Sequence, residues 1–144
     1  MIKFIDDIKR FQEMYSLPRP TLPTIVPEGL ITRQTQFLKI IKDEVEEGQE
    51  ILDNYAKNPN DLEALVELSD WLGDMVVYCT SEAMRYGIPL PEVLNCIMES
   101  NFSKLGTDGK AIMKEGKVQK GPNFYKPEPA IKSLLENMRG IKQS

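Results

Sequence analysis

The sequence contains no histidine, only two cysteines, and no apolar run near the roughly 20 residues that a membrane-spanning helix requires. Without histidine, Ser-His-Asp and Cys-His triads, histidine zinc sites and histidine general bases are all excluded. Any catalysis must therefore rest on carboxylates, lysine, tyrosine or a hard metal ion. Cys79 and Cys96 lie in apolar stretches with helical periodicity, so we predict that both are reduced core residues.

Signals for export and for nucleic-acid binding are also missing. Residues 1–10 alternate apolar and charged side chains and lack the apolar centre of a signal peptide, so we expect a cytoplasmic protein that does not bind a membrane. The formal net charge of -4 argues against a broad nucleic-acid-binding face, which would be basic. A small phosphorylated ligand remains compatible, because a few lysines or a metal ion can hold it.

The 144 residues, with 41% hydrophobic and 28% charged side chains, predict one globular domain over residues 1–144. We place its core at about 31–105, a basic loop with a short hairpin at 106–127, and a C-terminal helical segment at 128–144. Asp61 is the expected N-cap of the third helix, and Gly87 is expected to end it. The apolar spacing predicts an all-α bundle of four to five helices. The predicted helices cover residues 2–15, 31–57, 61–86, 89–105 and 128–138.

The second predicted helix carries two acidic residues beside its apolar stripe. Glu44 and Glu47 are three residues apart and therefore share a face. Asp43, Glu46 and Glu50 point further round the helix and are expected to be ordinary solvated charges. A solvated role for Glu44 and Glu47 is the alternative interpretation of this helix alone.

The third predicted helix carries a longer acidic line. Glu63, Glu67, Asp70 and Asp74 recur at spacings of four, three and four, and the other faces are apolar. A helix this apolar is expected to be central and buried, so its acidic line would face inward or into a cleft. Buried carboxylates without partners are costly, and few cationic residues are placed to compensate them.

A divalent metal ion would compensate these carboxylates. Oxygen ligands without histidine or cysteine favour a hard ion, Mg²⁺ or Mn²⁺. Such an ion keeps open positions for water and phosphate oxygens, which is the arrangement for metal-assisted hydrolysis of a phosphoanhydride. A buried acid network bridged by lysine or water is the alternative.

Five segments follow one another along the chain: DEVEE at 43–47, ELSDWLGD at 67–74, YGI at 86–88, ESNFSKL at 99–105, and DGK followed by GKVQKGPN between 108 and 123. In this order they resemble the all-α nucleoside triphosphate pyrophosphohydrolase superfamily, its MazG-like and phosphoribosyl-ATP pyrophosphohydrolase-like group. Asp43 stands where the family's E-E-x-x-E element has its first glutamate, and Asp70 and Asp74 both fit the acidic position of the E-x-x-D element.

The resemblance implies hydrolysis of a nucleoside triphosphate to the monophosphate and pyrophosphate, in the cleaning of nucleotide pools. It also implies a homodimer or a dimer of dimers, because the helices of one chain complete only half of the bundle. Two alternatives stay open. One is a phosphoribosyl-ATP pyrophosphohydrolase, which the C-terminal motifs resemble less, and the other is a non-catalytic helical oligomer that binds metal.

On this interpretation Glu44, Glu47, Glu67, Asp70 and Asp74 bind Mg²⁺. Glu44 or Glu47 would also orient or deprotonate the water that attacks a phosphorus, expected to be the α one.

The C-terminal half offers residues for the substrate. Asn101 falls within an apolar stripe of its helix, where an amide needs a partner, and it could hold sugar or phosphate. Lys104, Lys117 and Lys120 belong to a locally basic segment that could bind phosphates. Trp71 could stack on a base but is expected to be a core residue.

Overall fold

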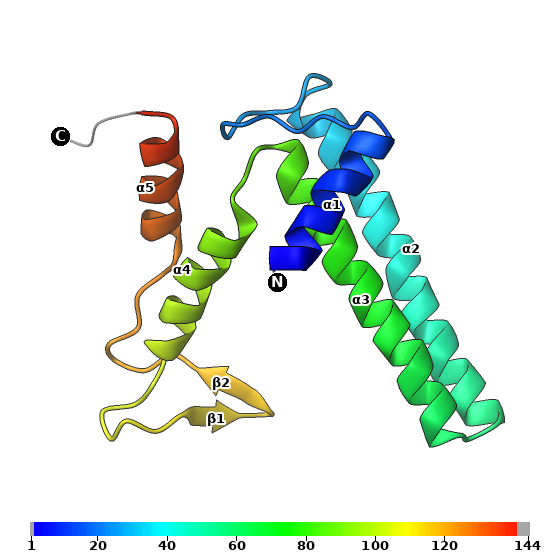
Figure 1. Ribbon diagram of the computed structural model, residues 1–144. Coiled ribbons are helices and arrows are strands. Elements are labelled where there is room, and N and C mark those ends of the chain that lie inside the picture. Colours follow the sequence, from blue (N-terminus) through cyan, green and yellow to red (C-terminus); the bar gives the residue numbers. More distant parts are fainter. Residues whose placement is uncertain (1, 141–144) are drawn as a thin grey trace. The chain divides into compact units, whose positions relative to one another are not determined.

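The computed structural model describes residues 2–140, and within them five helices and one small β-hairpin are present (Figure 1). The predicted all-α class is confirmed. The chain divides into two compact units, of which the first holds α1, α2 and α3 and the second holds α4, the hairpin and α5. The assignment of residues 1–144 to one domain stays a prediction. The elements are α1 (Ile2–Met14), α2 (Leu30–Lys57), α3 (Asp61–Arg85), α4 (Leu90–Phe102), β1 (Ile112–Lys114), β2 (Lys117–Gln119) and α5 (Glu128–Met138).

A short turn joins α2 to α3, and the two helices run antiparallel side by side (Figure 1). α2 ends before Pro59, which disfavours helical backbone at the residue preceding it. Asn60 has extended backbone, and its side chain accepts a hydrogen bond from the amide of Glu63 at 3.1 Å. The prediction that Asp61 caps α3 was therefore wrong by one residue. Asp61 lies in the first turn, where its carboxylate accepts a hydrogen bond of 2.6 Å from the hydroxyl of Tyr55.

The C-terminal end of α3 and the connector before α2 have the structure that the sequence predicts. Gly87 follows α3 with a φ of 64°, a left-handed conformation that glycine adopts without strain, so the predicted stop is confirmed. The proline-rich segment between Pro18 and Pro27 contains no helix. The amide of Thr24 anchors this segment by donating to the carbonyl of Tyr86 at 2.9 Å.

The buried centre of the first unit lies where α1 packs on the last turns of α3. Gln12 of α1 is fully buried, and its amide donates to the carbonyl of Ser81 at 2.9 Å. Arg33, near the start of α2, forms hydrogen bonds of 2.7 and 2.9 Å to the two carboxylate oxygens of Glu82. Arg85 lies 3.8 Å from the same carboxylate. Polar contacts thus fix α1 and α2 against this end of α3.

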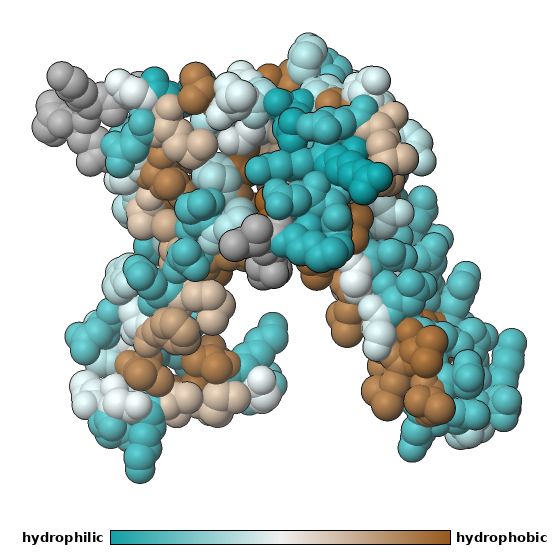
Figure 2. All heavy atoms as spheres, in the orientation of Figure 1, coloured by the Kyte–Doolittle hydropathy of each residue, from teal (hydrophilic) through white to brown (hydrophobic). Residues whose placement is uncertain are grey.

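The remainder of α3 is much less enclosed than its sequence predicts. Leu65, Leu72 and Val76 are each more than half exposed, and Cys79 is also exposed. The predictions that α3 is central and that Cys79 is a core residue were therefore wrong for the single chain. The reason is that α2 covers only one side of α3 along most of its length. Figure 2 shows hydrophobic residues at the surface of this hairpin, near the turn that joins the two helices.

In the second unit, the segment between α4 and α5 folds back onto the end of α4. The hydroxyl of Ser100 donates to the carbonyl of Tyr125 at 2.7 Å, and the amide of Gly121 donates to the carbonyl of Lys104 at 2.8 Å. A Cβ at Gly121 would collide with the carbonyl oxygen of Leu105, so only glycine fits there. β1 and β2 form the predicted short hairpin as an antiparallel pair. Over residues 2–140, no helix combines the length and the apolar character that a membrane span needs.

Candidate functional site

An acidic cavity of about 410 Å³ lies between α2 and α3. The predicted metal ligands Glu47, Glu67, Asp70 and Asp74 all line it, so the structure brings them together. Glu50 lines it too, although the sequence assigned this residue to the solvated side of α2. None of the residues that line this cavity is a lysine or an arginine. The full lining is Glu47, Glu50, Ile51 and Asn54 from α2, and Glu67, Asp70, Trp71 and Asp74 from α3.

Helical spacing explains how both helices supply this lining. Glu47, Glu50 and Asn54 are three and four residues apart on α2, and such residues are neighbours on one helical face. Glu67 begins the matching series on α3, in which Asp70 and Asp74 follow at three and four residues. Two antiparallel helices with these faces turned toward each other form an acidic channel along their seam.

Glu44 is the most buried acidic residue of α2, with only 4% of its surface exposed. Within the part of the chain that the structure describes, its Oε2 atom is buried and has no hydrogen-bond partner. Burial raises the pKa of this carboxyl, and the charges of Glu47 and Asp74 raise it further, while hydrogen bonding from Tyr78 lowers it. Tyr78 therefore offsets only part of the cost of burying this charge beside two other carboxylates.

Tyr78 stands on α3 one turn after Asp74. Burial raises the pKa of its hydroxyl, and the neighbouring carboxylates Glu44, Asp74 and Glu47 raise it further. The phenol consequently stays protonated at neutral pH and remains a hydrogen-bond donor toward these acids. Tyr78 was not among the predicted site residues, although its spacing of four from Asp74 places the two side chains on one face of α3.

Trp71 ties the two acid-bearing helices together at the acidic cavity. Its indole Nε1 donates a hydrogen bond of 2.7 Å to the backbone carbonyl of Glu44. Its ring packs on Gly48, where a Cβ would lie only 2.7 Å from the ring atom Cζ2. Trp71 thus packs α3 against α2, but it is half-buried at the wall of the cavity rather than enclosed in a core.

The donor set of this site suits a hard divalent cation. It consists of carboxylate oxygens, and the buried, unpartnered oxygen of Glu44 is the kind of atom that a cation would compensate. Across residues 2–140, however, no three histidine, cysteine or acidic side chains converge closely enough to form a ready-made metal centre. Glu44, Glu47, Glu67, Asp70 and Asp74 therefore stay predicted metal ligands.

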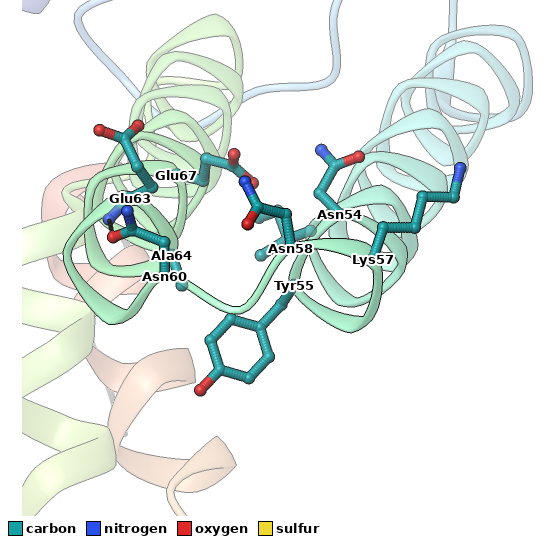
Figure 3. Close-up of a pocket in the computed structure, with 9 residues that line it drawn as sticks. Asn54, Tyr55, Lys57, Asn58, Asn60, Glu63, Ala64 and Glu67 are labelled. Atoms are coloured by element: carbon teal, nitrogen blue, oxygen red, sulfur yellow. Dashed lines mark hydrogen bonds between the residues drawn. The ribbon is translucent and has the colours of Figure 1, made fainter.

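A second cavity, here named the amide pocket, adjoins the acidic cavity on the side of the turn between α2 and α3. It has a volume of about 300 Å³, and Ile51, Asn54 and Glu67 line both cavities. In Figure 3 the side chains of Glu67 and Asn58 extend toward each other across the space between the helices. The pocket is lined by Ile51, Asn54, Tyr55, Lys57, Asn58, Asn60, Glu63, Ala64 and Glu67.

The predicted substrate-binding residues lie in the second unit. The ammonium groups of Lys104 and Lys120 lie 6.0 and 5.0 Å from the ring centre of Phe124, so both cations share one aromatic ring. Lys117 is on β2, paired with Lys114. Asn101 is exposed on α4 and is not enclosed by the apolar side chains of its stripe. The binding roles of Asn101, Lys104, Lys117 and Lys120 stay predictions.

The fold supports a comparison with known proteins. No protein-family model matches the sequence, and no curated protein matches it. A crystal structure from Exiguobacterium sp. 255-15, named a "putative NTP pyrophosphohydrolase", is similar to this chain with a TM-score of 0.50 and 21% sequence identity. The similarity covers 95% of this chain and 96% of that one. The two proteins therefore share a fold over nearly their full lengths.

Proposed function

We propose that this protein is a Mg²⁺-dependent nucleoside triphosphate pyrophosphohydrolase that serves to clean nucleotide pools. One observation carries the proposal: the buried carboxylate of Glu44, whose Oε2 atom has no hydrogen-bond partner within residues 2–140, adjoins carboxylates that line a single cavity between two helices. The shared fold with a protein named for this activity supports the proposal. The motifs that resemble the superfamily supply the five acids in the expected order.

In the proposed reaction, water attacks the α-phosphorus of the bound triphosphate. The water oxygen forms the new bond to phosphorus, the bridging bond between the α-phosphorus and oxygen breaks, and pyrophosphate leaves with that electron pair. Glu44 or Glu47 orients the water and accepts its proton. When bound by the five carboxylates, Mg²⁺ (or Mn²⁺) neutralises phosphate charge and lowers the pKa of water.

The lysines of the second unit are candidates for binding phosphate oxygens. Lysine acts on phosphate as a point charge. The ammonium groups of Lys104 and Lys120 both lie over the ring of Phe124, which brings two cations close together. We propose the same role for Lys117, and we propose that Asn101 binds sugar or phosphate.

Self-association is part of the proposal, as a homodimer or a dimer of dimers. Along α2, Ile31, Leu38, Val45 and Leu52 recur every seven residues, and all four are more than half exposed in the single chain. A seven-residue apolar repeat is the pattern with which helices pack against other helices. A soluble monomer rarely exposes so continuous an apolar face, and a second copy of this chain presents the matching one.

Sedimentation analysis tests this assembly. The chain mass is 16.4 kDa, so we expect about twice or four times this mass in solution. Val45→Glu places a charge on the apolar repeat and should shift the protein toward the monomer. Lys39→Glu changes an exposed charge on the same helix and should leave the assembly unchanged. A wild-type monomer at micromolar concentration would contradict the proposal.

Paired variants test catalysis. Glu47→Gln removes a carboxylate of the acidic cavity, and Glu46→Gln changes an exposed acid outside its lining. We expect Glu47→Gln to lose at least about 100-fold in kcat with the fold and assembly intact, since positioned acid–base groups contribute about 10²–10⁴-fold. Glu46→Gln should retain wild-type activity. Equal activities in the two variants would contradict the assigned role of Glu47.

A further inference from the structure

We infer that the amide pocket binds the nucleoside part of the substrate, while the phosphates lie at the acidic cavity. This inference rests on the proposed function and adds to it the location of base and sugar recognition. The two cavities adjoin along the seam of α2 and α3, because Ile51, Asn54 and Glu67 line both of them. A ligand with an anionic end and a neutral end can therefore extend along the seam of α2 and α3.

The amide pocket offers the hydrogen-bonding groups that a nucleobase requires. The side chains of Asn54 and Asn58 line the pocket and are exposed, and within residues 2–140 neither side-chain amide is engaged in a hydrogen bond, so both are accessible to a ligand. The side-chain oxygen of Asn60 accepts the hydrogen bond that caps α3, so its NH₂ group can still donate to a ligand. An asparagine amide presents a donor beside an acceptor, and this pair matches the edge of a base that carries an acceptor beside a donor.

The charge of the amide pocket favours the neutral part of a nucleotide over its phosphates. Glu63 and Glu67 bring two carboxylates to its wall, and Lys57 brings a single ammonium group. A free phosphate would meet net negative charge here, whereas a sugar hydroxyl could donate to Glu67. The volume of about 300 Å³ lies at the lower end of the range for small-molecule pockets, which suits one part of a ligand rather than a whole nucleotide.

The turn that forms this pocket is held by bonds that a change at Asn58 would leave in place. The backbone amide of Asn58 donates to the carbonyl of Asn54 at 3.0 Å, and the Tyr55 hydroxyl donates to Asp61 at 2.6 Å. Asn58→Ala therefore removes the free amide without removing either bond. Asn60 is unsuited to this test, because its side chain caps α3.

The test is a calorimetric titration in Mg²⁺ with two ligands. One is a set of α,β-methylene deoxynucleoside triphosphates carrying the four common bases, and the other is inorganic triphosphate, which has no nucleoside. We expect Asn58→Ala to weaken the tightest-binding nucleotide analogue about tenfold and to leave the affinity for inorganic triphosphate unchanged. Asn58→Gln, which keeps the amide, should fall between Asn58→Ala and wild type. Asn95→Ala, an exposed asparagine on α4, is the matched control.

Equal weakening of both ligands, or no weakening of the analogue, would overturn the inference, as would a wild-type protein that binds none of the analogues. The proposed function is tested separately, by turnover of natural nucleotides. Binding that depends on Asn58 without turnover would support the nucleoside pocket and contradict the pyrophosphohydrolase activity. If Asn58→Ala turns over nucleotides with unchanged KM and base preference, the result would support the enzyme activity and contradict the assignment of the pocket.

Discussion

The indole Nε1 of Trp71 donates a hydrogen bond of 2.7 Å to the backbone carbonyl oxygen of Glu44. This bond joins α3 to α2 beside the acidic cavity, and the ring lies against Gly48 one turn further along α2. The position of one helix relative to the other decides which acids face each other. Trp71 and Gly48 therefore fix the register in which Glu47 lines one cavity with Asp70 and Asp74.

Gly48→Ala should destabilise the wild-type protein, because the new Cβ would lie 2.7 Å from Cζ2 of Trp71 and the ring or the helix must shift. Overpacking of this kind costs about 1–3 kcal/mol, which exceeds the gain of up to about 1 kcal/mol from placing alanine in a helix. In a Trp71→Leu background the collision is absent, so Gly48→Ala should be neutral or stabilising. Denaturant unfolding of the four proteins measures this change of sign. Destabilisation of equal size in both backgrounds would show that the ring does not require glycine.

Mn²⁺ should quench the fluorescence of Trp71, which is the only tryptophan of the chain and lines the acidic cavity. A paramagnetic ion held by the carboxylates would lie close to the indole. Glu47→Gln or Asp70→Asn should raise the Mn²⁺ concentration that gives half-maximal quenching about tenfold or more, whereas Glu46→Gln should leave it unchanged. Excess Mg²⁺ should reverse the quenching by competition. Quenching that is absent, or that all three variants share equally, would argue against a metal at these residues.

Glu44→Gln should make the metal-free protein more stable than wild type at neutral pH. The folded-state pKa of Glu44 lies above its unfolded value of about 4.3, so between these two values the folded protein binds more protons than the unfolded one. The contribution of this group to wild-type stability is therefore largest below about pH 4. It falls as the pH rises from the unfolded pKa to the raised folded pKa. The advantage of the variant should vanish near pH 4. Thermal unfolding of both proteins from pH 4 to pH 8 in a chelating buffer measures this difference in stability.

Added Mg²⁺ should reverse this order. An ion that binds only the folded protein at 100 times its Kd stabilises by about 2.7 kcal/mol. Wild type should gain this stability at pH 7.5, and Glu44→Gln should gain much less. A Glu44→Gln variant that is less stable than wild type at neutral pH without metal would contradict the account of Glu44 as an incompletely compensated buried charge.

Arg33→Ala should lower the free energy of unfolding by about 2–4 kcal/mol, since it leaves Glu82 with Arg85 at 3.8 Å as its nearest cation. The side chains of Arg33 and Glu82 are each only 11% exposed. Lys3→Ala breaks the exposed pair with Asp7 and should change stability by less than about 0.5 kcal/mol. Nucleotide turnover should survive in both variants, because neither pair lines the two cavities. Similar stability losses in the two variants would contradict this difference.

The sequence predicted local features well because they depend on neighbouring residues. Helical spacing placed Glu47, Glu67, Asp70 and Asp74 on facing surfaces, and Gly87 marked the end of α3. The contacts of Arg33 and Gln12 could not be predicted in this way. They depend on how α1 and α2 pack on the last turns of α3, and no spacing within one helix contains that information.

The degree of burial could not be predicted either. An apolar helix such as α3 is expected to be enclosed, but a single chain supplies α2 on only one side, and Leu72 and Cys79 remain exposed. Asn54 and Glu50 were missed for a different reason, since they carry no distinctive motif. Their spacing of seven and three from Glu47 was the signal that could have revealed them.

The most direct test of the central claim is product analysis. The purified protein is incubated with canonical and modified nucleoside triphosphates, with and without Mg²⁺, and the products are identified by mass. We predict Mg²⁺-dependent release of monophosphate and pyrophosphate, with oxygen from ¹⁸O-labelled water entering the monophosphate. Release of orthophosphate and a diphosphate would mean attack on the terminal phosphate and would contradict the mechanism. Absence of turnover across the panel would contradict the proposed enzyme, and binding of Mn²⁺ alone would then assign the acidic cavity to a metal-binding scaffold.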